Sequence, residues 1–103
     1  MLNIEEIRSY AASKFTEEEK PKVALEVCYS EPGSYASYTY YRAKVFVTVQ
    51  YLHFQRSRWF GCSIELSGKT VDEAEEKVMR WYKSEIDKWW DAHTRDRGRT
   101  DQT

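Results

Sequence analysis

The residues best suited to holding a metal ion are two cysteines and two histidines, Cys28, Cys62, His53 and His93. Zinc prefers such ligands, and structural zinc sites usually contain at least one pair close together in the sequence. No two of these four residues form a CxxC or another short ligand spacing, so we predict no metal site and no cofactor. In a chain without a secretory signal, cysteines are expected to be small buried thiols, because disulfides form in oxidising compartments.

Hydrolytic chemistry would require paired carboxylates, or a nucleophile beside a base, within a cleft. Glu26, Glu31 and Glu65 have suitable side chains, but no motif surrounds any of them. Two of them, Glu26 and Glu65, fit equally well as outward-facing residues of β-strands. We therefore predict that the protein is not an enzyme.

Composition indicates one globular domain. The chain has 103 residues, of which 41% are hydrophobic and 32% are charged, and its formal net charge is −1. A near-zero charge gives no general attraction to nucleic acid or to anionic membranes. No segment approaches the roughly 20 apolar residues of a membrane span. The N-terminal sequence MLNIEEIRSY lacks the basic and apolar regions of a signal peptide, so we expect a cytoplasmic protein that does not bind membranes.

Periodicity predicts five secondary-structure elements. A helix begins after Asn3, which is a good N-cap with Glu6 three residues later, and it ends by Lys20 because Pro21 follows. Alternating apolar residues predict strands over about 23–29, 39–53 and 59–66, with a polar turn at 55–58 between the last two. A capping box formed by Thr70 and Glu73 starts a helix that extends to about residue 94.

These elements predict a single α+β domain over residues 1–94, followed by a polar, flexible tail over residues 95–103. Each strand has one apolar face, so two helices packed on one side of a three-stranded antiparallel sheet would close the core. The order α-β-β-β-α makes this a two-layer domain.

The same order of elements resembles the double-stranded-RNA-binding domain. The stretch from Ser67 to Ala74, SGKTVDEA, looks somewhat like the junction that enters the second helix of that family. The resemblance implies the topology of the fold. In that family, lysines at the start of the second helix bind phosphates, whereas the matching positions here include Asp72, Glu73 and Glu75, which would repel RNA. The resemblance therefore extends to the fold and not to the function.

The last predicted helix contains more aromatic bulk than a small domain easily buries. We predict an inward stripe made of Val71, Ala74, Val78, Trp81, Ile86 and Trp89. A helix over 70–94 would be about 36 Å long, whereas strands of eight residues span only about 26 Å. The end of the helix would then overhang the sheet. We predict that this end forms a protein interface, with anchors at Ile86, Trp89, Trp90 and His93. The alternative interpretation is that Trp89 caps the core and Trp90 lies on the first helix.

The first hairpin is rich in tyrosine and serine, which are common in recognition loops. We predict further protein contacts at Tyr35, Tyr38 and Tyr40. Four basic residues, Arg42, Lys44, Arg56 and Arg58, would serve as rim charges or as phosphate contacts.

Together these features predict a small, non-enzymatic protein-binding module of the adaptor or inhibitor type, which acts through exposed aromatic surface and forms a homodimer. The alternative is a nucleic-acid-binding module that uses the basic hairpin and the basic tail.

Overall fold

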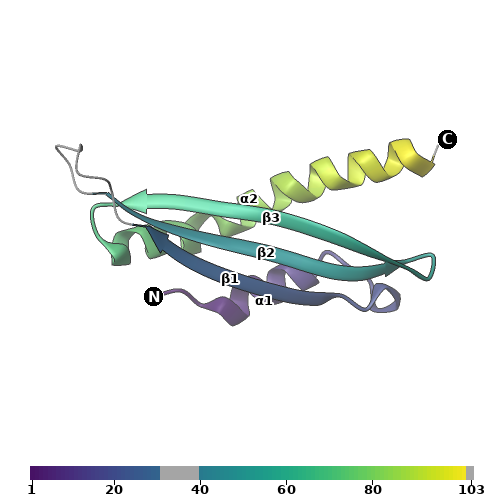
Figure 1. The fold of residues 1–103 in the computed structure, drawn as a ribbon, viewed down its shortest axis with the longest axis horizontal. Coiled ribbons are helices and arrows are strands. Elements are labelled where there is room, and N and C mark those ends of the chain that lie inside the picture. Colours follow the sequence, from purple (N-terminus) through teal and green to yellow (C-terminus); the bar gives the residue numbers. More distant parts are fainter. Residues whose placement is uncertain (31–39, 102–103) are drawn as a thin grey trace.

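The computed structural model confirms the predicted α+β architecture with the order α-β-β-β-α (Figure 1). It describes residues 1–30 and 40–101, with side chains up to residue 95. The predicted contacts at Tyr35 and Tyr38 lie outside the described residues. The elements are α1 (Ile4–Ala12), a short 3₁₀ helix (Glu17–Glu19), β1 (Lys22–Ser30), β2 (Tyr41–His53), β3 (Arg56–Gly68) and α2 (Val71–Asp101).

The first helix begins as predicted. The side chain of Asn3 accepts a hydrogen bond from the backbone N–H of Glu6 at 3.1 Å, which satisfies one of the free donors at the helix start. The helix ends at Ala12, well before Pro21 requires it to end. Phe15, three residues after the end of the helix, is buried in the core.

The sheet is antiparallel, with the strand order β1-β2-β3. Val45 at the centre of β2 lies opposite Val27 of β1 on one side and opposite Ile64 of β3 on the other. Both β2 and β3 have 13 residues, so each spans about 44 Å. This is much longer than the eight-residue strands that the predicted helix overhang assumed.

The turn between β2 and β3 is shorter than the predicted polar loop. Only Phe54 and Gln55 lie between the paired residues His53 and Arg56. Both turn residues have left-handed backbone angles, with φ of 51° and 64°. Two positive φ values are typical of a type I′ hairpin turn, which usually has the sequence Asn-Gly. Because this sequence has no glycine there, the predicted position of the turn was wrong.

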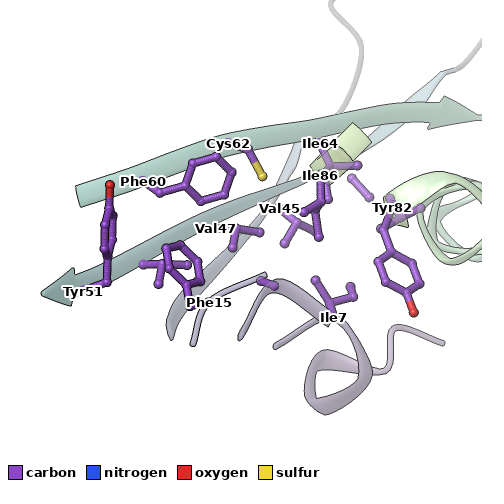
Figure 2. Packing of buried hydrophobic residues seen from close by; sticks show 14 of the residues in the cluster. Ile7, Phe15, Val45, Val47, Tyr51, Phe60, Cys62, Ile64, Tyr82 and Ile86 are labelled. Atoms are coloured by element: carbon purple, nitrogen blue, oxygen red, sulfur yellow. The ribbon is translucent and has the colours of Figure 1, made fainter. Parts of the chain in front are cut away.

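The core lies entirely between the sheet and the two helices. The odd-numbered residues of β2 face the helices, and so do the even-numbered residues of β3 (Figure 2). The opposite face of the sheet is not covered by a described element (Figure 1). The fully or nearly buried core side chains are Ile7, Ala11, Phe15, Ala43, Val45, Val47, Val49, Tyr51, Phe60, Cys62, Ile64, Ala74, Val78, Tyr82 and Ile86.

The inward stripe of α2 differs from the prediction. Val78, Tyr82 and Ile86 are buried at steps of four residues, and Trp90 continues the row against the core. Val71, Trp81 and Trp89, which the predicted stripe included, are substantially exposed. Figure 1 shows α2 crossing the strands at an angle. A row of side chains four residues apart is inclined to the helix axis. Because α2 crosses the sheet obliquely, such an inclined row is the one that faces the sheet.

The predicted overhang is also corrected. The second helix has 31 residues and extends to Asp101, so it is about 46 Å long, close to the length of the longest strands. It reaches the same end of the molecule as the β2–β3 hairpin, and its last turns diverge from the sheet beyond the β3 edge (Figure 1). Residues 86–93 therefore lie over the sheet and not past its end.

Candidate functional site

Of the four predicted anchors near the end of α2, Ile86 belongs to the core, and Trp90 and His93 are half-buried against it. Ile86 is 0% exposed. The ring of Trp90 packs edge-on against Phe15 at 4.8 Å and against Phe60 at 5.5 Å between centroids. Ile86 is therefore too deeply buried to anchor an exposed interface, whereas Trp90 is half-buried and its role as an anchor stays a prediction.

His93 is held over the same end of the sheet. Its Nε2 atom lies 2.6 Å from the hydroxyl oxygen of Tyr51, and this distance indicates a hydrogen bond. Its ring also lies 5.3 Å from that of Phe60 and 5.6 Å from that of Trp90. His93 thus contacts aromatic rings of the core, and because its side chain is half-buried its role as an anchor stays a prediction.

Trp89 is different from its neighbour Trp90. It is 43% exposed and lies along the β3 edge, where it lines a shallow hollow of about 250 Å³ together with Gly61, Cys62 and Ser63. Trp81, two turns earlier on α2, is 46% exposed. These two rings belong to a second row of α2 residues beside the buried row. We call it the α2 stripe, and it consists of Trp81, Glu85, Lys88, Trp89 and Ala92.

A second apolar surface lies at the β2–β3 hairpin. Phe54 in the turn is 83% exposed, and Trp59 on the uncovered face of β3 is 62% exposed. Leu52, on the same sheet face as Trp59, is also exposed. Its register partner on β3 is Ser57, so Leu52 and Trp59 are diagonal neighbours within side-chain reach. We call Leu52, Phe54 and Trp59 the hairpin patch.

The sequence interpretation did not select the hairpin patch. Trp59 begins the strand predicted over 59–66 and is 62% exposed on the outward face, and a large outward aromatic residue is a signal for a contact site. Phe54 lies between the strand predicted over 39–53 and the turn predicted at 55–58, and it was assigned to neither. Its position at a turn was hidden because the turn has no glycine.

The tyrosines of the first hairpin are only partly described. Tyr40 is exposed, as the predicted contact role requires. Tyr29 donates a hydrogen bond from its hydroxyl to a carboxylate oxygen of Glu75 at 3.0 Å. Burial and, secondly, this carboxylate raise the pKa of Tyr29. Tyr29 therefore joins β1 to the start of α2.

The four predicted basic residues do not form one surface. Arg42 and Lys44 lie on the uncovered sheet face, where both approach the carboxylate of Glu65 at 3.6 and 3.8 Å. Arg56 and Arg58 lie at the other end of the sheet and point to the helix side, since they alternate with the outward residues of β3. The centres of the two pairs are separated by about 31 Å along the strands. A single stretch of phosphates would therefore have to cross from one sheet face to the other.

A polar cluster fixes α2 against α1. The carboxylate of Asp87 accepts a hydrogen bond from the hydroxyl of Tyr10 at 2.5 Å and pairs with the ammonium of Lys14 at 2.5 Å. Lys14 first, and Tyr10 second, lower the pKa of Asp87. This cluster therefore joins α2 to α1 through polar contacts.

The cysteines differ in their surroundings. Cys28 is exposed on the outer side of β1, so the expectation that both thiols are buried was wrong for this residue. Cys62 is buried in the core. Burial, and to a smaller extent the charge of Glu85, raises the pKa of Cys62 to about 11. Within the described residues, no group of three or more His, Cys, Asp or Glu side chains is arranged to hold a metal ion.

None of the helices in the described ranges is long and apolar enough to cross a membrane.

Comparison of the chain with protein-family models, with curated proteins and with solved structures found no match in any of the three. The candidate site is therefore defined by exposed aromatic surface alone, namely the α2 stripe and the hairpin patch.

Proposed function

We propose that the protein is a small, non-enzymatic protein-binding module whose contacts are made by the hairpin patch and the α2 stripe. The observation that carries this proposal is the exposure of Phe54, Trp59, Trp81 and Trp89 at 43% to 83%, while one face of the sheet supports a well-buried core. Tryptophan and other aromatic side chains are the usual anchors of protein interfaces. The exposure of these aromatic side chains in the isolated chain therefore favours binding to another protein.

The distribution of charge favours a protein partner over nucleic acid. Arg42 and Lys44 share Glu65, which neutralises part of their field, and Arg56 and Arg58 are centred about 31 Å away on the opposite face. Nucleic-acid binding relies on basic side chains that follow one line of phosphates. The aromatic patches do not depend on such an arrangement.

The test compares two variants of the hairpin. Phe54→Asn with Trp59→Thr removes two rings of the hairpin patch, while asparagine suits the left-handed turn and threonine suits a strand. Arg56→Thr with Arg58→Thr is the matched control, because it changes the same hairpin and leaves the patch intact. Tagged chain is used to isolate partners from cells of the source, and the affinity for a purified partner is then measured at about 0.1 and 0.5 M salt.

We expect the patch variant to weaken binding by at least about tenfold, as for the loss of one interface anchor, and the arginine variant to change it less than about threefold. Binding should also persist at the higher salt. Two results would overturn the proposal. One is a partner affinity that the patch variant leaves unchanged. The other is co-isolated nucleic acid whose binding falls steeply with salt and is lost in the arginine variant.

A further inference from the structure

The α2 stripe has a spacing typical of helix–helix contacts. Trp81, Glu85, Lys88 and Ala92 follow one another at steps of four, three and four residues, which places them along one side of the helix. Trp81, Lys88 and Ala92 are exposed and Glu85 is partly exposed. Figure 1 shows that α2 emerges beyond the β3 edge, so on this side of the molecule the helix is outermost.

The order of these four residues is self-complementary when the helix is reversed. In an antiparallel pair of α2 helices centred between Ile86 and Asp87, Trp81 of one copy lies opposite the partner's Ala92, and Glu85 lies opposite the partner's Lys88. The large side chain of Trp81 then packs against the small Ala92, and the acidic Glu85 faces the basic Lys88. Because of the two-fold symmetry, each of these pairs occurs twice. In a parallel pair each residue would face its own copy, which would place Glu85 against Glu85 and Lys88 against Lys88.

The position of this centre agrees with the rest of the fold. Glu85 and Trp89 both lie beside Cys62, which is the midpoint of the 13-residue strand β3. A two-fold axis there would allow the helices to run side by side along the whole stripe, and would leave the hairpin patches at the two far ends. Trp89 of each copy would flank the seam on the side of the sheet.

We propose that the occupant of the α2 stripe is a second copy of this chain, bound through antiparallel pairing of α2 with α2. The proposal rests on the proposed protein-binding function and assigns one of its two surfaces to self-association. The seam has only about three helical turns and few large side chains, so it belongs to the small interfaces, and a dissociation constant of roughly 1–100 μM is expected.

The test is charge reversal with rescue, measured by sedimentation equilibrium from about 5 to 500 μM protein, a range chosen to bracket the expected constant. Glu85→Lys places lysines face to face at the two positions that flank the centre of the seam and should weaken the dimer roughly tenfold. Lys88→Glu should do the same with two carboxylates. The double variant Glu85→Lys/Lys88→Glu restores both pairs and should return the dissociation constant to within about threefold of that of the wild type.

Two controls separate the seam from general effects. Glu76→Lys makes the same charge change on an exposed residue away from the stripe and should leave self-association unchanged. Trp81→Ala should weaken the dimer, whereas Trp59→Ala, which removes an equally large exposed ring from the hairpin patch, should not. Far-UV circular dichroism establishes that each variant is folded.

A wild-type chain that stays monomeric over the whole range would overturn the inference, as would single reversals without effect or a double variant that does not recover. A monomeric chain whose Trp81 is covered by a different protein would also overturn it. None of these results decides the proposed function, which depends on partner binding by the hairpin patch and is measured separately.

Discussion

Trp89 and Trp90 are adjacent in the sequence, yet replacing each by alanine should have clearly different effects on stability. Trp90 packs on Phe15 and Phe60 within the core. Trp90→Ala removes both ring contacts and leaves a cavity, and such truncations cost about 3–4 kcal/mol. Trp89 is 43% exposed and lies over a hollow already open to solvent. Its removal creates no closed cavity and should cost about 1–2 kcal/mol.

The assay is urea unfolding followed by far-UV circular dichroism, at a protein concentration below about 1 μM so that self-association contributes little. The expected difference of about 2 kcal/mol corresponds to roughly 10 °C in Tm for a domain of this size. An m-value shared by both variants would show that the same two states are compared. If Trp89→Ala were as destabilising as Trp90→Ala, the assignment of Trp90 to the core and Trp89 to the surface would be refuted.

Three further predictions test local features of the fold. Gln55→Gly should stabilise the protein by about 1 kcal/mol, because glycine adopts the left-handed angle at this position without strain; a lower urea midpoint would contradict this turn geometry. Asp87→Asn should cost less than about 1 kcal/mol at pH 7, since the pair with Lys14 is partly exposed. Folding lowers the pKa of Asp87 below its unfolded value of 3.8, so the charged carboxylate stabilises the fold above that pH. This stabilisation is lost as the pH falls through the folded pKa. The wild-type advantage in urea midpoint should therefore shrink between pH 5 and pH 3, in the range of carboxylate titration, and an advantage that persists would argue against the ion pair. Iodoacetamide at about pH 8 should modify Cys28 rapidly and should not modify Cys62 until the protein unfolds. Only the thiolate reacts, and burial raises the pKa of Cys62 to about 11. Equal labelling of both cysteines in the native state would show that Cys62 is accessible.

The strands were predictable because residues with a period of two all lie on the same face of a strand, and that face must be the buried one when they are apolar. Val45, Val47 and Val49 share one face of β2, and apart from Phe46 the residues that alternate with them are polar, so this face of the sheet was expected to be the buried one. The turn after β2 was not predictable in the same way. Phe54 and Gln55 lack the residue types that mark a type I′ turn, so the sequence showed no short-range signal at that point.

The rotation of α2 depends on tertiary structure. On this helix, apolar residues cover the buried row at Val78, Tyr82 and Ile86 and also the neighbouring row at Trp81 and Trp89. Both rows have helical spacing, so periodicity alone allows either to face the core. The oblique crossing of the helix over long strands selects the first row, and neither the crossing angle nor the strand length is fixed by the pattern within 70–94.

Phe54 shows why exposed aromatic residues in this protein suggest binding. Its backbone has a φ of 51°, which costs a residue other than glycine about 1–2 kcal/mol. Its side chain is 83% exposed and, among the described residues, has a ring contact with His53 at 4.3 Å, worth about 1 kcal/mol. Phenylalanine therefore does little for the stability of the isolated chain, and asparagine would fit the turn better. In a complex, however, the same ring would be buried at the tip of a rigid two-stranded arm, where it would contribute about 2 kcal/mol. Replacing Phe54 by asparagine is thus expected to strengthen the fold and weaken partner binding together, a combination that a purely structural role for the ring does not produce.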